Sequence, residues 1–225
     1  MIHVGLTQQR RSPAPILTVA LSKNRVVRAA LLAGLFAGGL LYACAAYVPL
    51  WMSRQMHRDA VSSSAALIPL LVGWSVGSTV GVRVLVRWGM RASVAGGFAI
   101  AVVGSAALAA VVLFGLPSTM AYGALGIMGL GVGPAASGAL IAAQTEAAWN
   151  ERGMVTSVVY GARMLGGALM VAALGGKASV EGAPPGARFV GIAVTALSAF
   201  ALLALLAPGR LRASIVDAES PAIEA

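Results

Sequence analysis

Long apolar runs separated by short charged clusters form the main pattern of this chain. A helix rises 1.5 Å per residue, so about 20 apolar residues are enough to cross the hydrocarbon layer of a membrane. The runs of about that length are 29–52, 64–82, 92–113, 120–143, 155–174 and 189–207. The pattern therefore predicts an all-α membrane protein with six transmembrane helices.

The cluster "RVLVRWGMR" at 83–91 interrupts the apolar pattern. Arg83, Arg87 and Arg91 are spaced four residues apart, and the flanking runs 64–82 and 92–113 contain no ionisable side chain. Each arginine at the centre of a bilayer costs about 2.5–3.5 kcal/mol, so three together would force the segment out of the membrane. The cluster is predicted to be the loop that joins the second span to the third.

Composition supports a membrane protein and argues against nucleic acid as a partner. Hydrophobic residues make up 59% of the chain and charged residues 10%, against about 45–50% and 25% in soluble domains. The net charge is +9, but the basic residues lie in short clusters without interleaved aromatic residues, unlike a nucleic-acid surface. The expected partner is the lipid bilayer.

The distribution of Lys and Arg predicts the orientation. If the N-terminus is cytoplasmic, eleven of the 16 basic residues lie on that side and four on the other, with Arg163 inside a span. Cytoplasmic loops carry the excess of basic residues, so both termini are predicted to be cytoplasmic. The expected protein is a multi-pass protein of the cell (inner or plasma) membrane. Its predicted parts are a basic N-terminal segment at 1–28, a bundle at 29–207 and a cytoplasmic tail at 208–225.

Glycine spacing predicts which faces pack. Glycines four residues apart lie on one helix face and let neighbouring backbones approach closely; they are Gly34 and Gly38, then Gly73, Gly77 and Gly81, then Gly129 and Gly133. The spans at 92–113 and 189–207 carry no ionisable, amide or indole side chain. They are assigned to the lipid-facing periphery, which leaves the other four spans to line any pathway.

Polar side chains within those four spans are the candidates for a substrate path. Arg163 is the most informative, because an intramembrane charge is costly unless it meets water, a partner or carbonyl groups. The alternative is that its long side chain extends back to the cytoplasmic interface. For isolated hydroxyls, such as those of Ser75 and Ser137, bonding to the helix's own carbonyls is the alternative. The candidates for the path are Tyr42, Trp74, Ser78, Gln144, Tyr160 and Arg163.

No catalytic residue, metal site or cofactor is expected. All seven carboxylates lie outside the spans, and no nucleophile–base pair lies within them, so the chain is not predicted to be an enzyme. His57 and Asp59 have no third ligand nearby. Cys44, the single cysteine, is expected to pack in the apolar interior.

The stretch "GLGVGPAASGALIAAQ" at 129–144 is glycine-rich but lacks the Lys-Ser/Thr ending of a phosphate-binding loop. Within a span, Pro134 removes one backbone hydrogen bond, and the preceding glycine permits a bend. Gly133 and Pro134 are therefore predicted to form a helix hinge.

Five stretches of the sequence, in their order along the chain, resemble the major facilitator superfamily. The resemblance is specifically to the C-terminal six-helix half of the fourteen-helix drug:proton antiporters. The resemblance rests on "YVPLWM", "LIPLLVGWSVGS", "RVLVRWGMR", "GLGVGPAASGALIAAQ" and "ERGMVTSVVYGARMLGG". It implies one bundle built as a 3+3 inverted repeat. It also implies a cytoplasmic gate in the loop of Arg83, Arg87, Gly89 and Arg91, although Val82 and Val86 stand where the family motif has Gly and Asp.

The resemblance implies half of a secondary transporter of the multidrug-efflux type. In such carriers alternating access comes from rocking two bundles against each other. The expected partners are a small amphipathic substrate, protons, and either a second six- or eight-helix half or a homodimer mate. A split transporter, a homodimerising half and a gene fragment all remain open. The alternative function is a truncated, non-transporting remnant or a regulatory membrane partner of an intact carrier.

Overall fold

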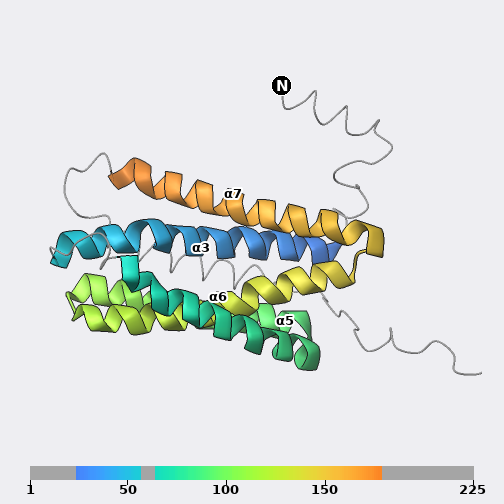
Figure 1. Cartoon of the computed structure of the whole chain (residues 1–225), viewed down its shortest axis with the longest axis horizontal. Coiled ribbons are helices and arrows are strands. Elements are labelled where there is room, and N and C mark those ends of the chain that lie inside the picture. The colour runs from blue at the N-terminus through green and yellow to red at the C-terminus, as the bar shows by residue number, and fades with distance from the viewer. Residues whose placement is uncertain (1–23, 57–63, 179–225) are drawn as a thin grey trace, which may run out of the picture.

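The computed structural model describes residues 24–56 and 64–178, and this part of the chain is helical throughout apart from short turns (Figure 1). Its elements are α3 (Arg25–Met56), the short η1 (Ala65–Leu67), α5 (Ile68–Phe114), α6 (Ser118–Thr145), the short η2 (Trp149–Glu151) and α7 (Arg152–Ala178). Four of these helices are long and apolar enough to cross a membrane. The all-α class is thus confirmed for the described residues, and the four long apolar helices fit a membrane protein. The predicted sixth span at 189–207, the tail at 208–225, His57 and Asp59 lie outside them.

The prediction of a loop at 83–91 is wrong in one respect, because most of this segment is helical. Helix α5 continues through Arg83 and Arg87 and reverses at a single residue, Gly89, with φ 84° and ψ 173°. Glycine reaches positive φ without the steric cost that a Cβ brings. The three arginines are exposed, so the helix continues into a charged end. We call residues 68–88 the first arm of α5 and residues 90–114 the second arm.

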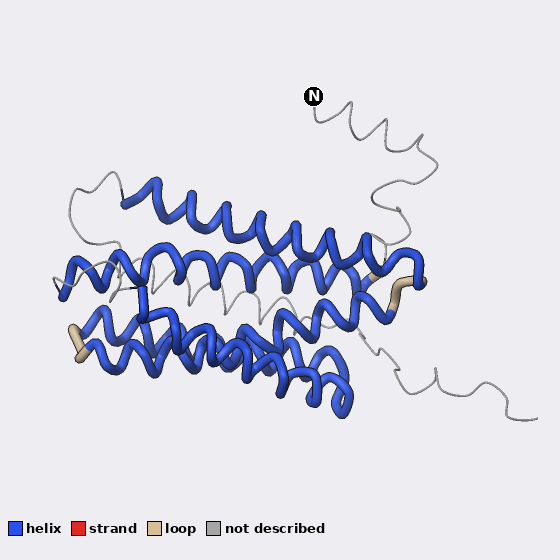
Figure 2. The backbone as a smooth tube through the Cα atoms, viewed as in Figure 1, coloured by secondary structure: helices blue, strands red, loops and turns tan. Residues whose placement is uncertain are grey.

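The second arm ends in a tight turn that leads into α6. Gly115 adopts a left-handed conformation at φ 63°, and its N–H donates to the carbonyl of Val111. Pro117 then precedes α6. Figure 2 shows this turn and the turn between α6 and α7 as short loops at opposite ends of the bundle.

Helix α3 begins four residues earlier than the predicted span. Asn24 Oδ1 accepts a hydrogen bond from the backbone N–H of Val26 at 2.8 Å, which caps the helix start. Arg25 and Arg28 therefore lie on the helix, although they were expected in the segment at 1–28 that precedes the bundle.

Helix α6 lies in the middle of the described bundle. Gly133 contacts the first arm of α5, and Gly131 meets Ala101 of the second arm. On another side, the Cys44 thiol of α3 donates to Met128 Sδ at 3.8 Å. Cys44 is buried, in agreement with the packing role expected for it.

Two helix pairs make matching close contacts. In the α3–α7 pair, a Cβ at Gly38 would overlap the Arg163 carbonyl oxygen. In the pair of α6 with the first arm, a Cβ at Gly133 would meet the Trp74 carbonyl oxygen. The spacing of the other contacts agrees: Gly34 with Val159 corresponds to Gly129 with Leu70, and Leu35 with Gly166 corresponds to Leu130 with Gly77. The predicted glycine faces are thus confirmed as helix–helix contacts.

The members of each pair run parallel to one another, and the two pairs run in opposite directions (Figure 1). The parallel sense follows from contacts that advance together along both helices, as from Gly34 to Gly38 on α3 and from Val159 to Arg163 on α7. The α3–α7 pair and the pair of α6 with the first arm therefore pack in the same way but run in opposite directions.

The two ends of the bundle differ in charge. Arg25, Arg28, Arg83, Arg87, Arg91 and Arg152 all lie toward the end that contains Gly89, which we call the Gly89 end. A hydrogen bond from Asn24 Nδ2 to Glu146 Oε2 at 3.3 Å places the start of α3 beside the end of α6 there. We call the opposite end, with the Gly115 turn, the Gly115 end.

Candidate functional site

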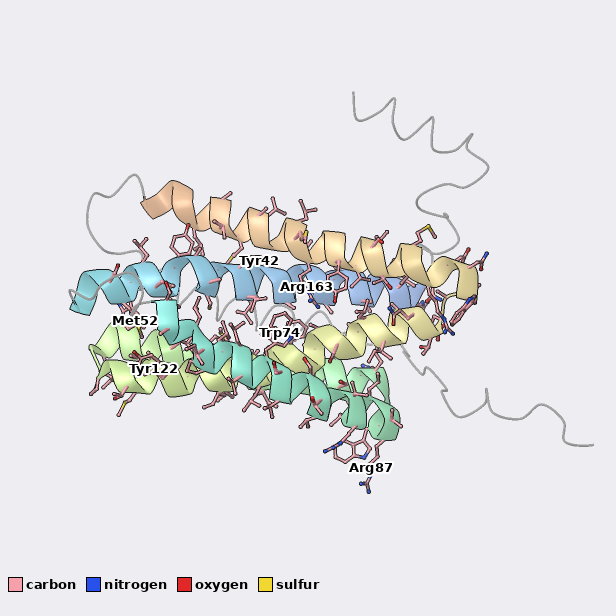
Figure 3. All side chains as sticks on the ribbon, viewed as in Figure 1. Tyr42, Met52, Trp74, Arg87, Tyr122 and Arg163 are labelled. Atoms are coloured by element: carbon pink, nitrogen blue, oxygen red, sulfur yellow. The ribbon has the colours of Figure 1, made fainter. Side chains whose placement is uncertain are left out.

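Arg163 is buried beneath two aromatic rings from different helices. Its residue surface is 8% exposed. The guanidinium carbon Cζ lies 5.0 Å from the ring centroid of Tyr160 and 5.8 Å from that of Trp74. Both distances fall within the range of a cation–π interaction. Figure 3 shows Arg163 reaching from α7 toward Trp74 on the first arm of α5.

The depth of this contact favours the interior position of Arg163 over extension to the interface. Trp74 lies about 14 Å along its helix from Arg83, the nearest charged residue of the first arm, at 1.5 Å per residue. Arg163 itself lies about 16 Å from Arg152 at the start of α7. Because the guanidinium lies against Trp74, it remains inside the apolar part of the bundle.

No carboxylate neutralises Arg163 within the part of the chain that the structure describes. The acidic residues there are Glu146 and Glu151, and both lie in the turn region between α6 and α7 at the Gly89 end. Arg163 Nε is buried and has no hydrogen-bond partner among the described residues. The rings interact with its charge but leave the N–H group without an acceptor.

Two half-exposed tyrosines flank the buried arginine. Tyr160 is 44% exposed and Tyr42 is 40% exposed. Tyr42 lies over Gly167 of α7, where a Cβ would strike its ring. We call Tyr42, Trp74, Tyr160 and Arg163 the arginine–aromatic cluster. Four of the six path candidates thus contribute to one region.

The two other path candidates, Gln144 and Ser78, lie outside the cluster, as does the isolated hydroxyl of Ser137. Gln144 Nε2 donates to Thr156 Oγ1 at 2.7 Å, which joins the end of α6 to the beginning of α7. Ser137 Oγ donates to the carbonyl of Gly133 in its own helix at 2.8 Å. Such bonding to the helix's own carbonyls was the alternative expected for isolated hydroxyls. Ser78 is partly buried, and its backbone lies against Gly133. These three do not belong to the cluster.

The residues of the predicted gate lie on α5, and those of the predicted hinge lie on α6. Arg87 points away from the bundle at the Gly89 end (Figure 3), with Cζ 5.9 Å from the Trp88 ring. Helix α6 is continuous through Pro134. Gly81 packs directly against Pro134, so the first arm meets the predicted hinge.

The comparisons with known proteins give no family. No protein-family model matches the chain, and no curated protein matches it.

Ser93 was absent from the sequence-based candidates but joins three segments near the Gly89 turn. Its Oγ lies 3.0 Å from the carbonyl oxygen of Gly81 and 3.3 Å from that of Pro134. This contact depends on how helices that are distant in the sequence pack together. The hydropathy of a single span therefore could not predict it. Ser93 is buried and joins α6 at Pro134 to both arms of α5.

The matching helix pairs also explain why Trp74 meets Arg163. Their carbonyls occupy equivalent positions, one against Gly133 and the other against Gly38. Trp74 and Arg163 thus occupy equivalent positions of the two pairs, and the indole of one lies against the guanidinium of the other. The result is a cation flanked by aromatic faces.

Proposed function

We propose that this chain is one half of a secondary transporter of the major facilitator type, a six-helix bundle with a 3+3 inverted repeat and both termini in the cytosol. It works in the cell membrane against a second bundle and exports small amphipathic compounds by alternating access. The matched contacts of the α3–α7 pair and of α6 with the first arm carry this proposal. An inverted repeat of this kind is a recurring design of secondary transporters.

The position of the arginine–aromatic cluster supports a pathway. Binding sites of such carriers lie near the bilayer midplane, at the interface between repeats. Arg163 and Trp74 come from the two matched pairs and meet at mid-depth, and the exposed rings of Tyr42 and Tyr160 provide access. The gate at Arg83, Arg87, Gly89 and Arg91 closes the cytoplasmic end of this path, and Gly133–Pro134 lets α6 bend.

The uneven covering of the helices supports a second bundle. Among the described helices, α6 has the largest share of buried residues and α7 the smallest. Tyr160, Met164, Leu165 and Leu169 of α7 are all exposed. In the proposed carrier part of this surface faces the other bundle, supplied by another protein or by a second copy of the chain.

Cysteine accessibility tests the proposed aqueous path. Cys44→Ala removes the single native thiol, and Tyr160→Cys or Val103→Cys then adds one probe. Because a thiol reacts as its thiolate, Tyr160→Cys in a water-filled path should react with a water-soluble maleimide about tenfold or more faster than Val103→Cys in lipid. Val103 is the matched control, since its 61% exposure exceeds the 44% of Tyr160.

Equal and slow labelling of the two cysteines would contradict the transporter proposal, because a non-transporting remnant leaves this face of α7 in lipid. If the path is present, export of two fluorescent probes of opposite charge, ethidium and 8-anilino-1-naphthalenesulfonate, by pump-deficient cells expressing the chain alone separates the two kinds of second bundle. Export of either probe above an empty-vector control indicates two copies of this chain. Absence of export of both probes indicates a different protein as the second half.

A further inference from the structure

The charge of Arg163 points to a substrate class that differs from the cationic drugs typical of multidrug carriers. We propose that the arginine–aromatic cluster binds a small organic anion, with a carboxylate, sulfonate or phosphate group on the guanidinium and a flat apolar body on the rings of Tyr160 and Trp74. This inference rests on the proposed function and names the substrate class of its site.

The first ground is the unsatisfied hydrogen-bonding capacity of Arg163. A guanidinium has five N–H donors arranged as a planar fork that matches carboxylate and phosphate oxygens. Arg163 is more than nine-tenths buried, and its Nε donor has no acceptor among the described residues. Aromatic faces attract the positive charge but accept its N–H groups only weakly. An anionic group supplies the missing acceptors.

The second ground is the charge balance at this depth. An isolated cation in the apolar interior is costly to retain unless it meets a partner. The described carboxylates, Glu146 and Glu151, stay in the turn region at the Gly89 end, and Glu146 accepts a hydrogen bond from Asn24. A bound anion neutralises Arg163 where these side chains do not reach. A cationic compound would instead add a second positive charge to an uncompensated one.

The third ground is the shape of the surroundings. Tyr160 lies with its ring centroid 5.0 Å from Arg163 Cζ and remains 44% exposed, so one ring contacts the guanidinium and is also open to a ligand. Tyr42, which packs over Gly167 of α7, adds a second half-exposed phenol to the cluster. Aromatic side chains favour flat partners through offset stacking. The expected ligand is therefore an aryl or polycyclic anion.

Equilibrium dialysis of the purified full chain in a neutral maltoside detergent tests the proposal with radiolabelled 1-naphthoate as the probe. We expect saturable binding that unlabelled 1-naphthoate displaces about tenfold or more effectively than 1-naphthylmethylammonium, which has the same ring system and the opposite charge. A chain that prefers the ammonium compound, or does not distinguish the two, overturns the proposal.

Variants assign the preference to Arg163. Arg163→Gln should weaken 1-naphthoate binding by about 10–100-fold. Arg163→Lys should retain part of the preference, because it keeps the charge but loses the planar fork. Arg28→Gln removes an exposed arginine at the Gly89 end and should leave binding unchanged. Unaltered binding by Arg163→Gln overturns the assignment, and Arg163→Lys provides the same test if the glutamine variant is unstable.

Two further outcomes are decisive. If phosphatidylglycerol in the micelles displaces 1-naphthoate as well as 1-naphthoate itself does, the site binds lipid headgroups and the proposal fails. Rapid maleimide labelling of Tyr160→Cys together with no preference for 1-naphthoate would reject the anionic substrate while leaving the transporter function supported.

Discussion

Replacing Gly38 by leucine is expected to separate α3 from α7 and to cause the largest loss of stability of any single substitution considered. A Cβ at this position would overlap the Arg163 carbonyl oxygen and approach its side chain. A backbone atom within a helix cannot move aside, so the whole helix must shift. We expect a destabilisation of about 3 kcal/mol or more, at the upper end of overpacking effects. In a thermal unfolding assay in detergent, this corresponds to a fall in Tm of about 6–12 °C.

Gly161→Leu is the matched control on the partner helix. A Cβ at Gly161 has no atom within 4 Å, and leucine is a better helix former than glycine. Its Tm should stay the same or rise slightly. Equal falls in the two variants would show that added bulk alone is harmful. An unchanged Tm for Gly38→Leu would contradict the close α3–α7 contact, on which the comparison of the two helix pairs depends.

Phe98→Ala is expected to have the second largest effect. Phe98 lies on the second arm of α5 and is fully buried, with 0% exposure. Truncation in water-soluble cores costs about 3–5 kcal/mol, from transfer and cavity terms together. In a membrane, lipid replaces water as the surroundings of the separated helices, so mainly the cavity and lost packing remain. We expect a cost of about 2–3 kcal/mol, measured as a fall in Tm in detergent.

Phe114→Ala removes the same side chain from an exposed position. Phe114 ends the second arm with 76% exposure, so detergent or lipid surrounds it before and after truncation. Its Tm should change by less than a third of the Phe98→Ala shift. A larger effect at Phe114 than at Phe98 would contradict the packing of the second arm against α6.

Hydropathy was sufficient to predict the helices because a bilayer imposes a length on each crossing. Four predicted spans fall within α3, α5, α6 and α7, and the fifth, 64–82, begins at η1 and continues into α5. The packing faces were also predictable, since glycines such as Gly34 and Gly38 recur at the helical period. The turn at 83–91 was less predictable, because apolar patterns locate where a chain leaves the membrane but not how far a helix continues beyond it.

The sequence singled out the residues of the arginine–aromatic cluster one by one but not their arrangement. The rarity of intramembrane charge identified Arg163, and aromatic type identified Trp74 and Tyr160. Their contact depends on how two helix pairs pack, which the periodicity of one helix does not encode. Gln144 was chosen on the same polar criterion, but Thr156 engages it at the end of α6. A polar residue within a span therefore indicates either a binding site or a hydrogen bond between helices. Which of the two applies depends on the residue that it contacts in the folded bundle.

Sided labelling of single cysteines tests the threading of the chain through the membrane most directly. In a Cys44→Ala background, Val86→Cys places an exposed thiol near Gly89 without removing an arginine, and Thr119→Cys places one at the start of α6. An impermeant maleimide should label Thr119→Cys in intact cells and Val86→Cys only in inside-out vesicles. Labelling of both from the same side, or recovery of the protein in the soluble fraction without detergent, would contradict a bundle that crosses the membrane with its arginine-rich end in the cytosol.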